Sequence, residues 1–430
     1  MKKKKKPKVF LKNAIQNFKN VDKLVVLFVA FLSVIGMVTI YSITSVTFYN
    51  SIYENPLAYV NKQLFGLIVG FIGVTVILFI PYRLLKMLGL LAIYACPIIM
   101  IIVLLIGTGP GDVKSWIGIG PLSLQPVELV KIGLILAVAW FVSEIPQYYR
   151  HLTWKKIFTT FVEPIPFIVK IKRWFLSPWG VLAYTAVLLL LAMKQPDLGS
   201  GLILAAIGIV MVLCSGISWK TFFQISFIVT IGFVAVWNIK DVLLKEHQLN
   251  RFLMWKDPFA YEQEIGYQNI MGYVAIANGG ISGRGVGDGV QKYGYMSEPH
   301  NDFIVSIVAE ELGLVTVIAI ILVYFLMSFR IMRTALKTRD LFASLTCIGI
   351  GISFLVQAII NLGGVSGTIP LTGVTLPFIS YGGTSVMSSL LMLGVYFNVR
   401  SYIIEDNKRI KLEFIEKGRK NNEKKLQLIK

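Results

Sequence analysis

Long apolar stretches alternate with short polar ones along most of the chain, and this alternation predicts membrane-crossing helices. A bilayer core needs roughly 17–25 apolar residues in helical form. Ten stretches meet or approach that length: Leu24–Ile43, Leu64–Ile80, Leu88–Ile106, Leu122–Val142, Trp179–Met193, Leu198–Ile217, Phe222–Ile239, Phe303–Phe329, Leu341–Leu362 and Gly382–Val399. The fourth contains two charged residues and the fifth is short. The pattern predicts an all-α polytopic membrane protein with ten transmembrane helices.

Two longer segments interrupt the rhythm of spans and short loops. The segment 143–178 mixes lysines with Phe, Ile and Trp, which favours an amphipathic cytoplasmic segment on the inner leaflet, with a plain linker as the alternative. The segment 240–302, rich in Gly, Gln and Tyr, connects the seventh and eighth spans. Apolar residues between Tyr267 and Ile276 recur at helical spacing. We therefore expect a long extracellular loop that folds back onto the membrane mouth.

Composition and charge agree with a membrane protein. The chain has 430 residues, is 55% hydrophobic and only 15% charged, which excludes a soluble domain of this length. Of the net charge of +19, the tail 1–23 contributes +8 and residues 400–430 contribute +5. Two basic tails and an even number of spans predict that both termini are cytoplasmic. The run Lys2–Lys6 then serves orientation and contact with membrane lipids rather than nucleic acid.

The division of the chain follows from the spans. We expect a basic cytoplasmic tail over 1–23, one helical domain over 24–400 and a second basic cytoplasmic tail over 401–430. Three cysteines all lie in apolar spans and three histidines are isolated, so neither a disulfide framework nor a zinc cluster is predicted.

Asp302 is the acidic residue whose position suggests chemistry most directly. It closes the long polar loop, and the eighth span begins at the next residue, Phe303. An aspartate before an apolar run can cap the first turn of a helix. A carboxylate at the membrane boundary can equally act as a general base on a lipid-borne substrate.

Other polar residues have both a structural and a functional reading. Glu128 and Lys131 are three residues apart in the fourth span, so they share a helix face and could form a structural salt bridge or part of a polar cavity. Trp116 suits a membrane-interface anchor or a surface for stacking a sugar. Asp197 precedes Leu-Gly-Ser-Gly and is expected to cap the sixth span.

Several outward cations could receive a diphosphate, namely Lys62 (beside Gln63), Lys194, Arg251 and Lys292. Glu310 and Glu311 lie inside the eighth span and require polar partners. The Gly- and Pro-rich run 361–385 is irregular, and such backbone at membrane depth is tolerated only when it is buried in protein or lines a cavity. These features converge on the extracellular face.

Four motifs in order resemble the SEDS family of shape, elongation, division and sporulation proteins. They are Trp-Ile…Gln-Pro-x-Glu-x-x-Lys (116–131), Gln-Pro-Asp-Leu-Gly (195–199), Pro-x-x-Asp-Phe-Ile…Glu-Glu-x-Gly (299–313) and Asn361…Pro377-Phe-x-Ser-x-Gly-Gly-Thr-Ser. The resemblance covers about residues 24–400. Segments around Arg251, 266–268 and 285–295 resemble the division branch more than the elongation branch. Asn301, Lys62 and Thr368 depart from the usual Thr, Arg and aliphatic residue.

The resemblance implies an inverting peptidoglycan glycosyltransferase that polymerises lipid II for septal wall synthesis. Asp302 matches the family's essential acid and would be the catalytic residue. The substrate-binding candidates are Lys62, Gln63, Trp116, Glu128, Lys131, Asp197, Arg251, Gln291, Lys292 and Ser380. No tightly bound cofactor is implied, and a divalent cation (Mg²⁺ or Mn²⁺) at the lipid diphosphate is an open alternative to side-chain cations.

The resemblance also implies partners and a place in the cell. We expect lipid II as substrate, a class B penicillin-binding protein as transpeptidase partner, and other divisome membrane proteins, at the septal plasma membrane. The alternatives are an elongation-type polymerase, a lipid II flippase and a non-catalytic scaffold. A flippase needs polar residues through the membrane thickness, whereas here they concentrate on the outer face.

Overall fold

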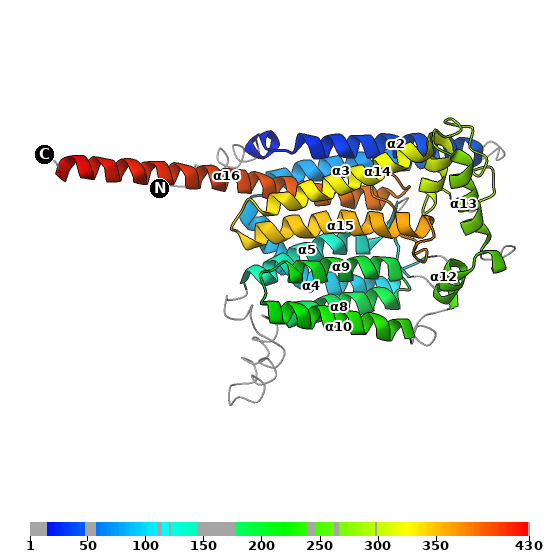
Figure 1. Cartoon of the computed structure of the whole chain (residues 1–430), viewed down its shortest axis with the longest axis horizontal. Helices are drawn as coiled ribbons and strands as arrows, with labels where there is room; N and C mark the ends of the chain where they lie inside the picture. The colour runs from blue at the N-terminus through cyan, green and yellow to red at the C-terminus, as the bar shows by residue number, and fades with distance from the viewer. Residues whose placement is uncertain are drawn as a thin grey trace, which may run out of the picture.

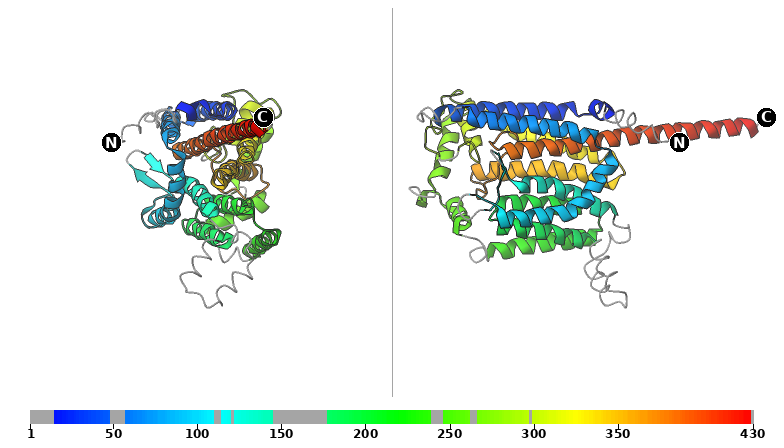
Figure 2. Two further views of the ribbon diagram at one scale, coloured as in Figure 1. Left: turned by 90° about the vertical axis from the view of Figure 1, so that its left-hand side faces the viewer. Right: turned by 180° about the vertical axis from the view of Figure 1, so that it is seen from behind.

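The computed structural model describes residues 15–47, 57–109, 114–119, 122–144, 177–238, 246–261, 266–296 and 299–428. Its long helices run side by side along one axis and form a single bundle (Figures 1 and 2). The smaller helices α12 and α13 lie beyond one end, which we call the loop end. The far part of α16 projects beyond the other end, the tail end (Figure 1). The predicted inner-leaflet segment 143–178 falls almost wholly outside the described residues.

Each predicted apolar stretch contains a helix. In chain order these helices are α2 (Lys23–Thr47), α3 (Ala58–Phe79), α4 (Tyr82–Ile106), α5 (Pro126–Glu144), α8 (Pro178–Lys194), α9 (Leu198–Leu213), α10 (Trp219–Asn238), α14 (Ile304–Ala335), α15 (Leu341–Val365) and α16 (Gly383–Leu428). Within the described residues, seven helices are long and apolar enough to cross a membrane, and α8 and α9 are shorter apolar helices. The all-α membrane class is therefore confirmed.

The fourth predicted span begins too early. Residues Ile117–Ile119 (β1) and Leu122–Leu124 (β2) pair as an antiparallel hairpin, and α5 starts only at Pro126. Proline suits the first turn of a helix because its missing N–H has no helical acceptor there. The second predicted span begins too late, because α3 starts at Ala58 and carries Lys62 and Gln63 within its first turns.

Glycines bring α3 and α16 into close contact. A Cβ atom added at Gly66 would lie 2.7 Å from the backbone oxygen of Gly383, and one at Gly70 would lie 2.5 Å from Leu390. On the other side of the bundle, a Cβ at Gly89 of α4 would lie 2.6 Å from the Leu136 oxygen of α5. Small residues allow helix backbones to approach closely where lipid gives no hydrophobic drive. These contacts pack α3 closely against α16 and α4 closely against α5.

The segment between α10 and α14 is folded against the bundle. It contains α12 (Glu246–Lys256), the 3₁₀ turn η2 (Phe259–Tyr261) and α13 (Tyr267–Gly279). Helix α14 bends at Gly313, whose φ of 80° is not helical. There the backbone N–H groups of Arg284 and Gly285 donate to the carbonyl oxygens of Glu310 and Glu311 at 2.9 and 3.0 Å. The kink thus exposes helix carbonyls that hold the loop in place.

An ionic cluster joins the helices at the tail end. Asp22, only 2% exposed, accepts hydrogen bonds from Arg330 of α14 at 2.9 Å and from Tyr396 of α16 at 3.1 Å. Arg400 lies 3.4 Å from the same carboxylate. Helix α16 then continues to Leu428, well past the predicted end of the tenth span at Val399.

Candidate functional site

Asp302 lies at the loop end, two residues before α14 begins at Ile304, and faces Gly373 in the irregular segment after α15. Phe303 occupies the N-cap position of α14, so Asp302 is not the capping residue that its position allowed. A Cβ atom placed on Gly373 would lie 3.5 Å from Asp302 Oδ2 and 3.3–3.4 Å from the two terminal nitrogens of Arg251. Gly373 has a φ of +77° and is itself exposed. A carboxylate and a guanidinium therefore flank one accessible backbone position. We call Lys62, Arg251, Asp302 and Gly373 the mouth site.

Arg251 reaches the mouth site from α12, in the loop that follows α10. Its Nη1 lies 3.4 Å from the carbonyl oxygen of Leu371, two residues before Gly373. One turn further along α12, Trp255 donates its indole N–H to the Gly367 oxygen at 2.9 Å. Together these contacts fasten α12 to the segment 367–373, so that a residue remote in sequence from Asp302 lies beside it.

Three half-buried aromatic rings connect Asp302 to α3. Tyr59 stacks on His300 with ring centroids 4.7 Å apart, and it meets Tyr381 edge-on at 4.7 Å. The Tyr381 N–H donates to the His300 oxygen at 2.9 Å. The exposed Lys62 has its ammonium 6.0 Å from the centre of the Tyr59 ring. This packing links Lys62 of α3, through Tyr59, to His300, which is two residues before Asp302.

Gln63 and Ser380 shape the segment that surrounds the mouth site. The Gln63 side chain donates to the Ser380 backbone oxygen and accepts from the Gly382 N–H, both at 3.1 Å. The Ser380 hydroxyl accepts from the Leu376 N–H at 2.8 Å. Both side chains are about 1% exposed. In this structure they hold backbone, and substrate contact by either one stays a prediction.

Glu128 and Lys131 form the ion pair that their spacing allows, with an N–O distance of 2.9 Å. Lys131 also donates to Gln357 of α15 at 2.8 Å, and Glu128 accepts from Ser388 of α16 at 2.7 Å. All four residues are at most 4% exposed. We call this set the helix anchor, because it joins α5, α15 and α16. It extends towards the mouth site through Gln357, which donates to the Thr375 oxygen at 2.9 Å.

The prediction that Lys292 is an outward cation is wrong. Its side chain is 1% exposed and its ammonium donates to Glu311 at 2.6 Å, to Ser42 of α2 at 2.7 Å and to the Gly287 oxygen at 2.8 Å. Burial favours this arrangement because an ammonium removed from water needs all of its donors satisfied. Lys292 thus fastens the loop 280–296 to α2 and α14.

Gln291 belongs to the same buried region. Its backbone N–H and that of Val290 donate to the Glu310 carboxylate at 3.1 and 3.0 Å, and its side chain is turned inwards at 6% exposure. The polar partners that Glu310 and Glu311 require are therefore the loop backbone and Lys292. We call Ser42, Lys292, Glu310 and Glu311 the loop anchor.

Trp116 and Asp197 lie at the edge of the site, around the β1–β2 hairpin. Trp116 is half-buried and its backbone pairs with Thr108 at 2.7 and 2.9 Å. Asp197 caps α9 by accepting from the Ser200 N–H at 3.0 Å, and Gln125 donates to its second oxygen at 3.1 Å. Burial raises the pKa of the Asp197 carboxyl, and the negative charge of Glu128 adds to this effect. The predicted cap is present.

Two residues of the site were not singled out from the sequence. Gln357 joins the helix anchor to the segment 374–375, and Tyr59 joins α3 to His300. An amide inside an apolar span is a signal that could have identified Gln357, since such groups need a partner in lipid. Tyr59 precedes the predicted span and carries no comparable signal.

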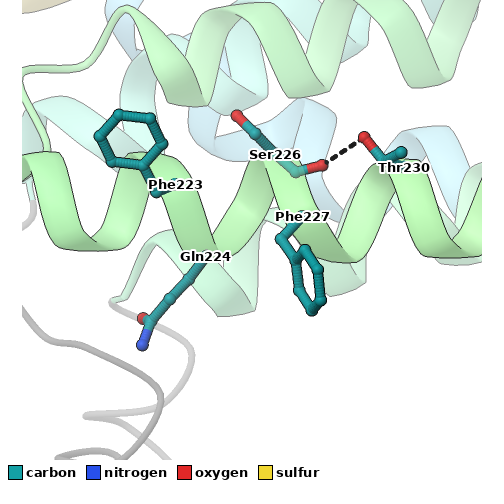
Figure 3. Close-up of a pocket in the computed structure, with 5 residues that line it drawn as sticks. All are labelled: Phe223, Gln224, Ser226, Phe227 and Thr230. Atoms are coloured by element: carbon teal, nitrogen blue, oxygen red, sulfur yellow. Dashed lines mark hydrogen bonds between the residues drawn. The ribbon is translucent and has the colours of Figure 1, made fainter.

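A groove on the outside of the bundle has no connection with these groups. It is lined by Phe223, Gln224, Ser226, Phe227 and Thr230, all from α10 (Figure 3). Phe223 and Phe227 are 65% and 66% exposed, and the Thr230 hydroxyl donates to the Ser226 backbone oxygen at 2.9 Å. A face of this composition suits contact with lipid tails and offers no ionisable group for catalysis.

The fold and the mouth site together define a polytopic helical membrane protein with a carboxylate and a guanidinium at the loop end of its bundle. A family model described as a cell cycle protein and covering FtsW, RodA and SpoVE matches residues 22–404. This chain therefore belongs to the FtsW/RodA/SpoVE family, the SEDS family that the motifs indicated.

Individual relatives match along nearly the whole chain. A probable peptidoglycan glycosyltransferase FtsW from Bacillus subtilis is 35% identical over 417 residues, covering 94% of this chain and 97% of the relative. The stage V sporulation protein E of the same organism is 32% identical, covering 89% and 97%.

Solved structures match the fold. A chain from a peptidoglycan synthase complex, studied for the coordination of polymerisation and crosslinking, has a TM-score of 0.66 at 25% identity and covers 89% of this chain and 98% of its own. The rod shape determining protein RodA of Thermus thermophilus has a TM-score of 0.60 at 24% identity, covering 88% and 96%.

Proposed function

We propose that this protein is a peptidoglycan glycosyltransferase that polymerises lipid II into glycan strands during septal wall synthesis. The observation that carries the proposal is the placement of Asp302 and Arg251 on either side of the exposed Gly373. A base and a cation at one accessible position are the groups that glycosyl transfer from a diphosphate donor needs. The relatives named FtsW support the same reaction and the division branch.

The reaction can be assigned to residues of the mouth site. The 4-hydroxyl of the acceptor's N-acetylglucosamine gives its proton to Asp302 while its oxygen attacks C1 of the donor's N-acetylmuramic acid. The bond between C1 and the diphosphate oxygen breaks, and lipid diphosphate leaves with that electron pair, which inverts C1. Arg251 would stabilise the departing diphosphate through directed N–H groups, and Lys62 through charge.

A divalent cation, Mg²⁺ or Mn²⁺, remains a candidate at the diphosphate. Among the described residues, His, Cys, Asp and Glu nowhere gather in a group of three or more that could hold a metal. Asp302 is the carboxylate of the mouth site that could contact such an ion, and the diphosphate itself would have to supply further oxygen ligands.

The reaction requires the mouth site to face the cell exterior, at the division septum, with both termini in the cytoplasm. The basic tails support this orientation. A flippase is less well supported, because the deeper charges Glu128, Lys131 and Glu311 are closed into short ion pairs and do not line a path.

We further propose a class B penicillin-binding protein as partner, together with other divisome membrane proteins. The similarity to a chain of a peptidoglycan synthase complex supports a partner of this kind. Binding should raise turnover by favouring a competent arrangement of the loop 246–296 over others.

The decisive experiment is polymerisation of lipid II in detergent by the purified full chain, with and without such a partner. Detergent removes any contribution from lipid transport, so glycan strands report transfer alone. We expect strands from the chain with its partner and fewer from the chain alone. Absence of strands under both conditions would contradict the enzymatic proposal, whereas equal rates would contradict only the activation by a partner.

A further inference from the structure

Asn361 lies where α15 approaches the mouth site, one turn before that helix ends. It is 2% exposed. Its side-chain nitrogen donates to the Val374 carbonyl oxygen at 2.7 Å and to the backbone carbonyl oxygen of Asp302 at 3.2 Å. A single carboxamide thus joins α15, the segment that carries Gly373, and the residue proposed as the base.

These two bonds hold both sides of the mouth site. Val374 follows Gly373, and the space beside Gly373 is bordered by Arg251 nitrogens and by Asp302 Oδ2. A change in the spacing of the Asp302 and Val374 backbones would therefore change the separation of the base from the position flanked by the guanidinium. Reacting groups displaced by about 1 Å can lose about a hundredfold in rate.

The Asn361 side chain makes its hydrogen bonds through its amide hydrogens and not through its oxygen. Its oxygen, Oδ1, is buried and accepts no hydrogen bond from the described protein atoms. An unsatisfied buried acceptor is unfavourable, so a residue kept only for packing would be better replaced by an apolar one of similar volume. Two amide hydrogens aimed at two carbonyl oxygens are what an apolar residue, or a carboxylate, cannot supply.

We propose that Asn361 is a positioning residue that sets the geometry of Asp302 relative to the Gly373 segment. This inference rests on the proposed polymerase function and deepens it. Asn361 acts through Asp302 and Val374, and its removal should reduce the chemical step more than the binding of lipid II.

Gln357 offers a matched control, because it lies one turn earlier on the same helix and binds the same segment. Its side-chain nitrogen donates to the Thr375 oxygen at 2.9 Å, while its oxygen accepts from Lys131. These hydrogen bonds join Lys131 of the helix anchor to the Thr375 backbone, and neither involves Asp302. Substitutions at Gln357 therefore test support of the segment alone, whereas substitutions at Asn361 also test the positioning of Asp302.

The first comparison is Asn361→Leu against Gln357→Leu, measured as kcat, KM and melting temperature of the full chain with lipid II. Asn361→Leu should lower kcat per folded molecule about 10- to 100-fold with KM nearly unchanged. Gln357→Leu should lower the melting temperature more, because it removes a partner of Lys131, and should lower kcat less.

The second comparison uses charge, with Asn361→Asp against Gln357→Glu. A carboxylate beside Asp302 disfavours the ionised base, so the rising limb of the pH profile of kcat should move to higher pH by about one unit for Asn361→Asp. For Gln357→Glu the rising limb of the pH profile should stay at the wild-type pH, because the new carboxylate faces Lys131.

Equal losses of kcat in both leucine variants, with both pH limbs unmoved, would overturn the positioning role and leave Asn361 a structural residue. If Asn361→Asp fails to fold, the leucine pair alone decides between these outcomes. A wild-type chain that forms no strands with its partner would instead refute the proposed function, and the inference would fall with it.

Discussion

The mouth site and the two buried anchors use the same residue types for opposite purposes. Lys131 and Lys292 each meet a carboxylate at 2.9 and 2.6 Å and are at most 2% exposed. Lys62 is exposed, and Arg251 is half-buried against the Leu371 oxygen. Charge alone therefore does not distinguish a cation proposed to bind substrate from one that holds the fold.

The difference follows from the balance of desolvation and pairing. A buried ammonium is tolerable only when a carboxylate and further acceptors replace its water. In the anchors, the lysine ammonium groups therefore bind to protein acceptors and not to solvent. A cation that receives a diphosphate must keep donors for a ligand that arrives and leaves, which requires access to solvent. The anchors thus support the loop and helices that present the mouth site, and substitutions should separate these roles.

The largest effect is expected for Asp302→Asn at the mouth site. Loss of a general base typically lowers rate by about 10²–10⁴-fold, so glycan strands should nearly disappear while the melting temperature stays within a few degrees of wild type. The control is Asp288→Asn, which changes an exposed aspartate of the same loop. Near wild-type polymerisation by Asp302→Asn would show that another group is the base.

Removal of a charge from an anchor should act on stability first. Lys292→Met leaves Glu311 buried without its cation, which typically costs about 3–5 kcal/mol. Glu128→Gln should destabilise in the same direction by stranding Lys131. Melting curves measure the effect, and Lys194→Met, at an exposed lysine, is the control. Unchanged melting of Lys292→Met would contradict the loop anchor.

Arg251→Lys should have an intermediate effect that is confined to catalysis. Lysine keeps the charge but loses the planar donor geometry that matches phosphate oxygens, so we expect kcat/KM to fall by about one or two orders of magnitude, as for loss of one stabilising donor. Melting should be unchanged. Arg284→Lys, an exposed arginine in the loop, should be silent. A silent Arg251→Lys would assign the diphosphate to other groups.

The smallest effect is expected for Lys62→Gln. An exposed charge acts through a screened field, so kcat/KM should fall only a few-fold, and the difference from wild type should shrink as salt is added. Lys114→Gln, also exposed at the loop end, is the control. A loss that is large and independent of salt would instead indicate a direct, desolvated contact between Lys62 and the substrate.

The sequence by itself determined the class of protein and pointed to Asp302 as its candidate base. Apolar stretches of bilayer length predict helices locally, because each helix satisfies its own backbone and the membrane sets its length. All ten predicted stretches contain helices, the Glu128–Lys131 spacing predicts their contact, and Asp302 precedes α14 as expected. The start of α5 was misplaced because β2 is as apolar as a helix end.

Only the tertiary structure decided which polar residues meet. The sequence pattern predicts that Lys292 and Arg251 are both outward cations. In the structure, Lys292 is buried and donates to Ser42, 250 residues away, whereas Arg251 lies beside Gly373. Such contacts depend on how helices pack and where α14 bends at Gly313, and no local hydropathy pattern encodes them. Contacts between residues far apart in the chain depend on packing, which is why the anchors and the hydrogen bonds of Asn361 to Asp302 and Val374 emerge only in three dimensions.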